Sequence, residues 1–174
     1  MNAKAQEIIN SLNEVKESAV GSFFIIETGT IRIVDDGYEQ GDGHSTRYIA
    51  EWCRDNSEGN YILVSIDLST KVCFDYLHSL DLGEYVHLIE GNSLTMLPIF
   101  GGIGFCYLDS ANDHEQTLKE FLIVWDNMRE HGIVMVDDCN LSSAELFKGD
   151  LLIPYLIANN IEFEQIGNQL KIRK

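Results

Sequence analysis

The chain has 174 residues, enough for one domain with a full hydrophobic core. It carries 28 Asp and Glu against 12 Lys and Arg, and this formal net charge of -16 repels phosphates at long range. We therefore expect neither nucleic acid nor an anionic membrane as a partner. No apolar stretch is long enough to span a bilayer, and residues 1–19 do not resemble an export signal. These features predict a cytoplasmic protein.

The four cysteines are far apart and form no C-x-x-C pair; they are Cys53, Cys73, Cys106 and Cys139. Each lies in an apolar or helix-patterned stretch, where a free thiol behaves as a small hydrophobic side chain. They are predicted to be plain core residues in a reducing compartment.

The first half of the chain alternates apolar runs with helix-patterned segments, without repeats or linkers. A helix is predicted over Ala3–Glu17 and a strand over Phe23–Glu27, which breaks at Thr28-Gly29. Ser45 is predicted to cap the next helix. The apolar positions of that helix recur at one-turn spacing and are Tyr48, Ile49, Trp52 and Cys53.

The middle of the chain continues this βα rhythm. Tyr61–Asp67 is predicted as the second strand and Thr70–Leu80 as the second helix of the series. Tyr85–Glu90 is predicted as the third strand. Gly91-Asn92-Ser93 then leads into a short helix that runs towards Phe100.

Two apolar runs tipped by carboxylates are the most informative feature of the sequence. Phe105–Asp109 is the fourth predicted strand, and the fifth starts at Ile133 and ends at Asp137-Asp138. Uninterrupted apolar runs are typical of parallel strands buried on both faces, so the carboxylates are predicted to meet at the edge where open α/β sheets bind ligands. A helix predicted between the runs is closed by His131-Gly132. Its apolar stripe is Leu118, Phe121, Leu122, Trp125 and Met128.

The last segment predicts a helix and a hairpin. The helix is expected over Ser142–Asn159, with an interruption near Pro154. Two short strands, Ile161–Ile166 and Gln169–Ile172, are joined by Gly167-Asn168, a junction that makes them antiparallel.

Five βα units followed by a closing hairpin make residues 22–174 resemble the class I S-adenosylmethionine-dependent methyltransferases. Within that superfamily the chain is most similar to the small-molecule O-methyltransferases related to macrocin and catechol O-methyltransferases. The resemblance implies an α/β, Rossmann-like, doubly wound sheet with strand order 3-2-1-4-5-7-6, mostly parallel with an antiparallel C-terminal hairpin. It also implies an N-terminal helix in residues 1–20, a single domain over residues 21–174, and S-adenosylmethionine as cofactor.

The resemblance implies a cofactor site at the strand ends, composed of Glu27, Thr28, Gly29, Thr30, Gly43, Ser45, Thr46, Asp67, Leu68, Gly91, Asn92, Ser93 and Asp109. Glu27 to Thr30 match the first cofactor motif, where glycine lets the backbone approach the ligand. Residues 43–46 match a helix entry whose N–H groups are open to the cofactor carboxylate. Asp67 matches the acid that accepts both ribose hydroxyls, and residues 90–93 match the adenine-edge segment. Taken alone, Asp67 also fits a turn residue, and residues 90–93 also fit a helix-capping turn.

Asp109, Asp137 and Asp138 match the three oxygen ligands that metal-dependent relatives use for a divalent cation such as Mg²⁺, with Asp138 where some relatives place Asn. Three carboxylates at one sheet edge repel one another unless a cation or raised pKa values relieve the repulsion. The alternative is that these side chains are solvated in loops.

Two further features depart from the family pattern. Relatives place a His or Lys shortly after the fourth-strand acid as general base, whereas here His114 follows Asp109 at a greater distance. His114 is our candidate for the base, and Asp109 is the other candidate catalytic residue; the alternative for His114 is an exposed first-turn residue. Residues 30–46 separate Gly29 from its helix and are either a lid over the cofactor, with Gly37, Gly41 and Gly43, or a surface loop.

Together these features predict O-methylation of a small hydroxylated molecule, assisted by a divalent cation. A methyltransferase-fold protein that binds cofactor without catalysis is the first alternative. A nicotinamide-dependent oxidoreductase is less favoured, because the turn after the first strand lacks G-x-G-x-x-G spacing. Little of the chain is left over to cap a substrate, so either the substrate site is open or a second subunit covers it, and our hypothesis is a homodimer.

Overall fold

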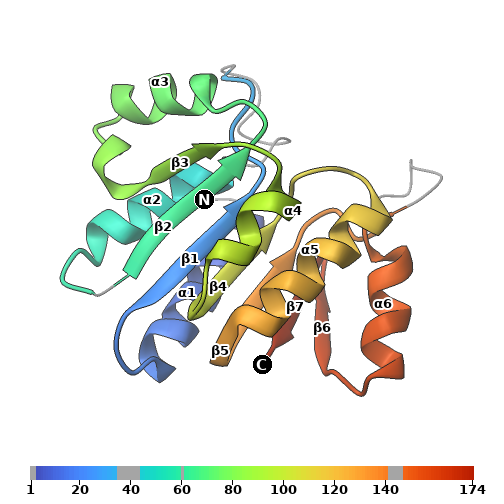
Figure 1. Cartoon of the computed structure of the whole chain (residues 1–174). Coiled ribbons are helices and arrows are strands. Elements are labelled where there is room, and N and C mark those ends of the chain that lie inside the picture. The colour runs from blue at the N-terminus through green and yellow to red at the C-terminus, as the bar shows by residue number, and fades with distance from the viewer. Residues whose placement is uncertain (1–2, 35–43, 60, 141–146) are drawn as a thin grey trace.

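The structure of the chain is a computed structural model that describes residues 3–34, 44–59, 61–140 and 147–174. It contains one sheet with strand order β3-β2-β1-β4-β5-β7-β6 (Figure 1). The strands are β1 (Phe23–Thr28), β2 (Tyr61–Asp67), β3 (His87–Glu90), β4 (Ile103–Leu108), β5 (Met128–Val136), β6 (Phe163–Ile166) and β7 (Gln169–Arg173). Strands β1 to β5 pair in parallel, and β7 pairs antiparallel with both β5 and β6. The implied doubly wound sheet and its order are confirmed.

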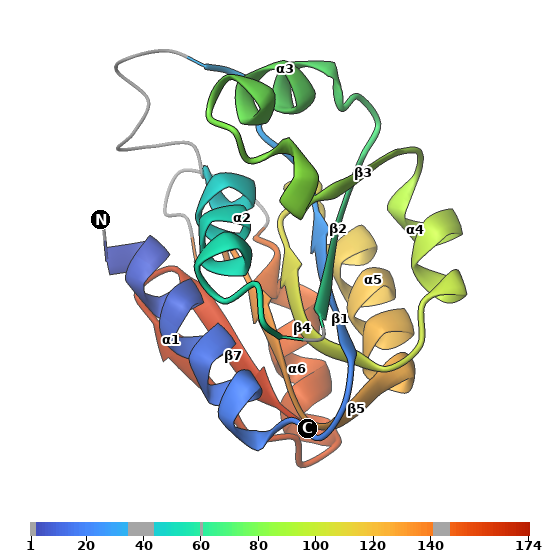
Figure 2. The same ribbon diagram turned by 90° about the vertical axis from the view of Figure 1, so that its left-hand side faces the viewer.

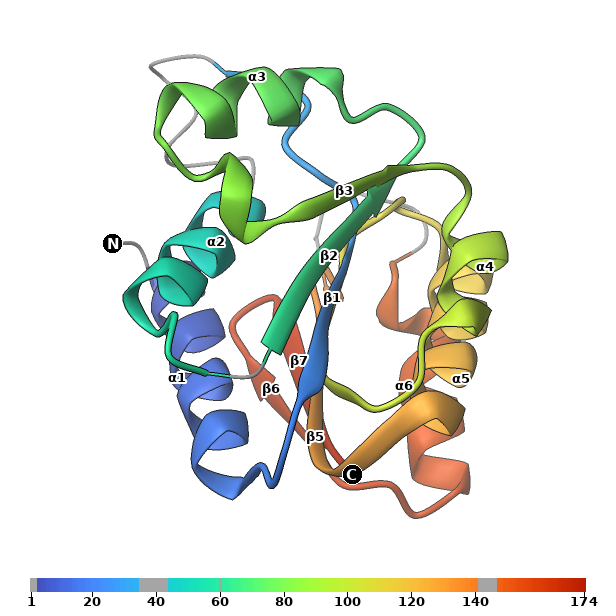
Figure 3. The ribbon, with the colours of Figure 1, turned by 60° about the vertical axis from the view of Figure 1, so that its left-hand side comes forward.

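Helices cover both faces of this sheet, as Figures 2 and 3 show. One face carries α1 (Ala3–Ser18), α2 (Ser45–Asp55) and α3 (Lys71–Ser79), and the short 3-10 helix η2 (Gly83–Tyr85) follows α3. The other face carries α4 (Ser93–Met96), η3 (Leu97–Ile99), α5 (His114–Asn127) and α6 (Gly149–Ala158). In the described parts of the chain, no helix combines the length and apolarity needed to cross a membrane.

The two helical layers give two hydrophobic cores, because successive residues of a strand point to opposite faces. Phe105 and Tyr107 of β4 join the core under α1, α2 and α3. Cys106 and Leu108 join the core under α5 and α6. Every residue of β4 is buried, as predicted for a central parallel strand. The four free cysteines are all buried too, which confirms their prediction as core residues.

The predicted end of the helix before the fifth strand is wrong. His131-Gly132 does not close α5, which ends at Asn127. The buried Met128 is already extended and pairs with Ile103 of β4. The chain turns only at His131, which has a φ of +63° and donates its backbone N–H to the Lys174 carbonyl.

Two smaller predictions also need correction. The third strand begins at His87 rather than Tyr85, because Tyr85 ends the 3-10 turn η2. The last helix is not interrupted near Pro154: α6 runs from Gly149 to Ala158 with Pro154 inside it. A proline removes a single backbone donor, here the N–H that would bond the Asp150 carbonyl in the first turn, and the buried Leu152 and Leu156 hold the helix on the sheet. The predicted start at Ser142 lies outside the described residues.

Ser45 does not cap α2 as predicted. It is the first residue of the helix, and the preceding His44 makes no capping bond with its side chain. The Ser45 hydroxyl instead donates to Glu27 Oε1 at 2.6 Å. A hydrogen bond to a buried carboxylate is stronger than one to a backbone amide, which explains why the hydroxyl turns inward.

Candidate functional site

The carboxyl ends of the parallel strands are aligned by backbone hydrogen bonds that continue past the strands. Gly29 N–H donates to the Ile66 carbonyl, Asp109 N–H to Thr28, and Gly91 N–H to Asp67, each at 2.8 Å. Asp137 N–H donates to the Leu108 carbonyl at 3.1 Å. The residues that follow four strands are therefore held side by side at one edge of the sheet, where the sequence placed the site.

Gly29 is the tightest point of this edge. Its φ is +88°, a left-handed conformation that favours glycine, and a Cβ there would lie 2.3 Å from the Asp109 carbonyl oxygen. The end of β1 can approach the end of β4 this closely only because position 29 has no side chain.

Two adjoining cavities open along the same edge. One has a volume of about 140 Å³ and is lined by residues 29–33, Ser45, residues 109–112 and Asp138. The second, of about 550 Å³, extends past Asp67 and Leu68 to residues 91–93 and Gln116. Both are lined by Arg32 and residues 110–112, so they form one crevice across the point where the strand order reverses.

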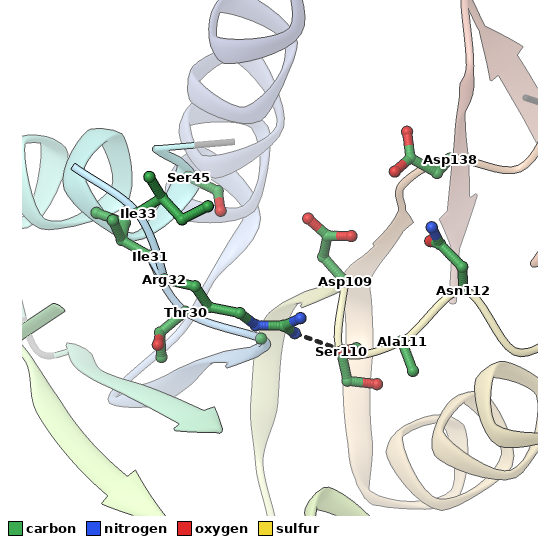
Figure 4. Close-up of a pocket in the computed structure, with 11 residues that line it drawn as sticks. Thr30, Ile31, Arg32, Ile33, Ser45, Asp109, Ser110, Ala111, Asn112 and Asp138 are labelled. Atoms are coloured by element: carbon green, nitrogen blue, oxygen red, sulfur yellow. Dashed lines mark hydrogen bonds between the residues drawn. The ribbon is translucent and has the colours of Figure 1, made fainter. Parts of the chain in front are cut away.

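Arg32 crosses this crevice (Figure 4). Its guanidinium donates to the Ser110 carbonyl at 2.6 Å and to Asp67 Oδ2 at 3.3 Å. Asp67 Oδ2 also accepts the Thr30 N–H at 2.8 Å. The segment after β1 is thus fastened to the acid that ends β2, and Arg32 separates the two cavities.

Glu27 lies beneath the smaller cavity rather than in its wall. The side chain is fully buried, and its two oxygens accept hydrogen bonds from the Ser45 and Ser65 hydroxyls. Burial raises the pKa of Glu27 to about 7, and the two serine hydroxyls oppose that rise. The side chain links β1, β2 and the start of α2.

Asp109, Asp137 and Asp138 come together as the sequence predicted. One carboxylate oxygen from each lies within 4.8 Å of the others. Asp137 is fully buried and its Oδ1 accepts the Asp138 N–H at 2.9 Å. Asp138 has a φ of +52°, and its Oδ1 accepts a hydrogen bond from Asn168 at 2.8 Å. The hairpin turn at the end of the chain therefore orients the third carboxylate.

Two lysines that the sequence analysis did not select contact these carboxylates. Lys148, at the start of α6 and 2% exposed, donates to Asp109 Oδ1 at 2.5 Å. Lys4 of α1 contacts Asp137 Oδ2. No spacing rule links Lys4 or Lys148 to Asp109, since 105 and 39 positions separate them and only the fold brings them together.

Burial and the neighbouring charges shift the pKa of Asp109, Asp138 and Lys4. Burial raises the pKa of Asp109 above its ordinary range, the Lys148 ammonium opposes the rise, and Asp137 adds to it. Burial and then Asp137 raise the pKa of Asp138. Burial lowers the pKa of Lys4, but the three carboxylates outweigh this effect and raise it. The cluster has three carboxyl groups and two ammonium groups, so in its ionised form it would attract a further cation.

A family model described as a methyltransferase domain matches residues 38–139, more than half of the chain. The chain belongs to this methyltransferase family. No curated protein matches the sequence. The family match, together with the observed sheet order, identifies a class I S-adenosylmethionine-dependent methyltransferase and removes the nicotinamide-dependent oxidoreductase from consideration.

Solved methyltransferase structures share the fold at low sequence identity. The O-methyltransferase NovP is similar with a TM-score of 0.72 at 14% identity, over 98% of this chain and 79% of its own. CalS11, a TDP-rhamnose 3'-O-methyltransferase, gives 0.68 at 13% identity, over 98% and 78%. MycE, solved with Mg and SAH, gives 0.63 at 13% identity, over 93% of this chain and 47% of its own. These likenesses support the fold.

The remaining predicted site residues of this methyltransferase lie as follows. Thr28 and Thr46 are buried, whereas Leu68 is exposed at the rim of the larger cavity. Asn92 caps α4 by accepting the Leu94 N–H at 2.9 Å. His114 is the first residue of α5 and, among the described residues, is not one that lines either cavity. Gly43 and the proposed lid residues 35–42 lie outside the described residues.

Proposed function

We propose that this methyltransferase transfers a methyl group from S-adenosylmethionine to a hydroxyl of a small molecule, assisted by a divalent cation. The observation that carries the proposal is the convergence of Asp109, Asp137 and Asp138 at the edge of a crevice that continues into the larger cavity. A carboxylate cluster beside a nucleoside-sized cavity suits an acceptor site next to a cofactor site.

The larger cavity supports placement of the nucleoside part of the cofactor. Asp67 and Leu68 line it at the end of β2, and residues 91–93 line it after β3. Asp67 uses Oδ2 for Thr30 and Arg32, while its Oδ1 accepts a longer bond of 3.2 Å from Ser69 N–H. We propose that ribose hydroxyls bind Oδ1 and that the methionine part lies near Gly29, Thr30 and Ser45 in the smaller cavity.

The carboxylate cluster fits a divalent cation by its chemistry. Mg²⁺ and Ca²⁺ prefer oxygen ligands, and the cluster offers three carboxylates. The hydrogen bonds from Lys148 and Asn168 engage Oδ1 of Asp109 and Oδ1 of Asp138, so Oδ2 of each remains as a possible ligand. Asp109, Asp137 and Asp138 would hold the cation, which at Asp137 Oδ2 would replace the Lys4 ammonium.

The chain's own groups then have distinct tasks. S-adenosylmethionine would supply the methyl group, and the cation would lower the pKa of a substrate hydroxyl. Gly29 and Asp67 would contact the cofactor. The carboxylate cluster, through its cation, would orient the acceptor oxygen towards the methyl group. Most of the rate gain in such a transfer comes from alignment of the reacting atoms.

The chain offers two candidates for the general base, Asp109 and His114. Asp109 lines the smaller cavity, where its carboxylate can reach the hydroxyl of an acceptor. His114 would need a shift of the segment before α5 to reach the same cavity. Replacement of His114 by Gln separates the two: retained methyl transfer would leave Asp109 as the candidate.

A small hydroxylated acceptor is supported by charge and by the structural relatives. A net charge of -16 disfavours polyanionic substrates such as nucleic acid. CalS11 is described as methylating the 3' oxygen of TDP-rhamnose, and MycE was solved with mycinamycin VI. We carry over to this chain the class of acceptor and no particular compound.

Two measurements test the proposal. Titration calorimetry with S-adenosylhomocysteine is expected to show one site per chain. A screen of hydroxylated compounds with labelled S-adenosylmethionine is then expected to show methyl transfer that Mg²⁺ increases and EDTA abolishes. Absence of cofactor binding would refute the proposal as a whole, whereas transfer that is unaffected by EDTA would refute only the role of the cation.

The second candidate function is cofactor binding without catalysis. It is supported by the absence of His114 from the described residues that line the crevice. In that case calorimetry would still detect the cofactor, but no hydroxyl compound would be methylated with or without Mg²⁺.

A homodimer also remains a prediction. Light scattering during gel filtration checks it, because two chains of 19.7 kDa each would give twice the mass of one. A mass of one chain at every protein concentration would contradict it.

A further inference from the structure

Glu120 of α5 is a buried carboxylate that the proposed mechanism does not use. Glu120 is 1% exposed, and no Lys or Arg in the described parts of the chain forms an ion pair with it. Its oxygens instead accept hydrogen bonds from four neutral groups. The donors are Thr28 Oγ1 at 3.1 Å, Ser110 Oγ at 2.6 Å, Gln116 Nε2 at 3.1 Å and Ser93 Oγ.

These donors come from separate parts of the crevice. Thr28 ends β1, Ser93 begins α4 after β3, and Ser110 follows Asp109 after β4. Ser93, Ser110 and Gln116 all line the larger cavity, where we place the nucleoside. Gln116 Nε2 also lies 3.0 Å from Ser110 Oγ and 3.4 Å from Ser93 Oγ. One carboxylate therefore fastens three groups of the cavity wall.

Every hydrogen bond in this group runs towards Glu120, whose oxygens accept from the three hydroxyls and from the amide. Ser93 and Ser110 must each turn their single hydroxyl proton towards Glu120. Gln116 must turn its NH₂ group inward, which leaves its carbonyl oxygen as an acceptor. A ligand in the larger cavity therefore meets the remaining lone pairs of Ser93, Ser110 and Gln116, so this part of the cavity wall accepts hydrogen bonds.

We infer that Glu120 is a positioning residue that makes the cavity selective for a base with an exocyclic amino group, by orienting Ser93, Ser110 and Gln116 as acceptors. This inference rests on the proposed function, because it takes the larger cavity as the nucleoside site. The 6-amino group of adenine donates hydrogen bonds, whereas the 6-oxo group of hypoxanthine accepts them and would face lone pairs. Burial of a polar side chain that pairs with no Lys or Arg of the described residues is costly, so a role in orientation explains its presence better than packing does.

The experiment compares S-adenosylhomocysteine with S-inosylhomocysteine, which differ in the 6-substituent of the base and in the proton that hypoxanthine carries on N1. Titration calorimetry of the wild-type protein is expected to give about tenfold tighter binding of the adenosyl compound, the ratio that one hydrogen-bond preference produces. Glu120→Leu keeps an apolar volume but frees the hydroxyl protons, and the ratio is expected to fall to about two or less. In Glu120→Gln the amide oxygen can take the place of Oε1, so the preference is expected to return.

Thr117→Val is the matched control on the same helix, because Thr117 is buried and its hydroxyl bonds only the Asp113 carbonyl. It is expected to lower stability and leave the ratio unchanged. If Glu120→Leu does not fold, the double variant Ser93→Ala, Ser110→Ala removes the acceptors directly and is expected to lose the preference. A wild-type ratio near one, or an unchanged ratio in folded Glu120→Leu, overturns the inference while leaving cofactor binding intact. No binding of either compound to the wild type overturns the proposed function too.

Discussion

Glu27 and Glu120 show how single side chains shape the crevice from behind, by holding residues that line it. Both are buried, and each is held by hydroxyl groups. Glu27 holds the start of α2 against β1 and β2, and Glu120 holds the wall of the nucleoside cavity. Neither position stands out in a hydrophobic pattern, because a lone charged residue in a helix or strand usually indicates exposure.

Replacement of Asp67 by Ala is expected to weaken cofactor binding by on the order of 2 kcal/mol, about 30-fold in Kd. The loss combines the hydrogen bonds to ribose with the release of Thr30 and Arg32, which Asp67 holds in place. Calorimetry with S-adenosylhomocysteine measures it. Asp75→Ala is the control, since Asp75 is an exposed carboxylate of α3 that pairs with Lys71. Equal affinity of Asp67→Ala and Asp75→Ala would refute the assignment of Asp67.

The pKa of Glu27 predicts a pH dependence of stability. Burial raises this pKa from 4.5 to about 7, so between those values the folded protein keeps a proton that the unfolded chain has released. Stability from this group is therefore present at low pH and is lost as the pH rises through about 7. Glu27→Gln stays neutral, and its free energy of unfolding relative to wild type is expected to rise by on the order of 1 to 3 kcal/mol between pH 4 and pH 8.

Urea unfolding at several pH values measures this difference for Glu27→Gln. Glu58→Gln is the control, because Glu58 is exposed and the same change there is expected to give a flat difference. A difference for Glu27→Gln that does not vary with pH would show that the carboxyl group titrates alike in the folded and unfolded chain.

At the scale of elements, the approach of the β1 and β4 ends depends on Gly29. Gly29→Ala would combine a left-handed backbone with a Cβ 2.3 Å from the Asp109 carbonyl oxygen, and we expect a loss of about 2 to 4 kcal/mol of stability. Gly21→Ala is a matched control, since its φ is +81° but a Cβ there meets nothing within 4 Å. Denaturant unfolding of both variants measures the contribution of close packing. Equal losses would contradict the crowding of the two strand ends.

The strands and the edge that carries the site follow from the sequence, because buried parallel strands are continuous apolar runs and their ends meet. Two runs, Phe105–Asp109 and the one ending at Asp137-Asp138, were sufficient to predict that three carboxylates come together. The structure confirms this prediction. Local rules failed where a tertiary contact competed with them. Met128 is extended and pairs with Ile103 instead of continuing α5. Ser45 donates its hydroxyl to Glu27 instead of capping α2.

The parts of the site that could not be predicted depend on long-range pairing. Lys4 and Lys148 reach the carboxylate cluster from the first helix described and from α6. Glu120 lies between Thr117 and Phe121, both buried, so it faces the sheet where the helical stripe alone predicts only apolar contacts. A charged residue of a helix can face the sheet where hydroxyl donors are present to bind it. For Glu120 these donors come from other elements, so the sequence of the helix does not reveal them.

At the scale of the whole molecule, the carboxylate cluster joins α1, β4, β5, the hairpin turn and the start of α6. A cation bound here would bind the folded chain and not the unfolded one, so MgCl₂ is expected to raise the melting temperature above that in NaCl of equal ionic strength. At a concentration of about 100 times Kd the gain is about 2.7 kcal/mol. Asp138→Ala is expected to reduce the shift, and Asp126→Ala, on the exposed side of α5, to retain it. Equal shifts in these two variants would place the effect of magnesium elsewhere on this acidic protein, whereas a shift confined to an intact cluster would show that the five elements meet at a metal site.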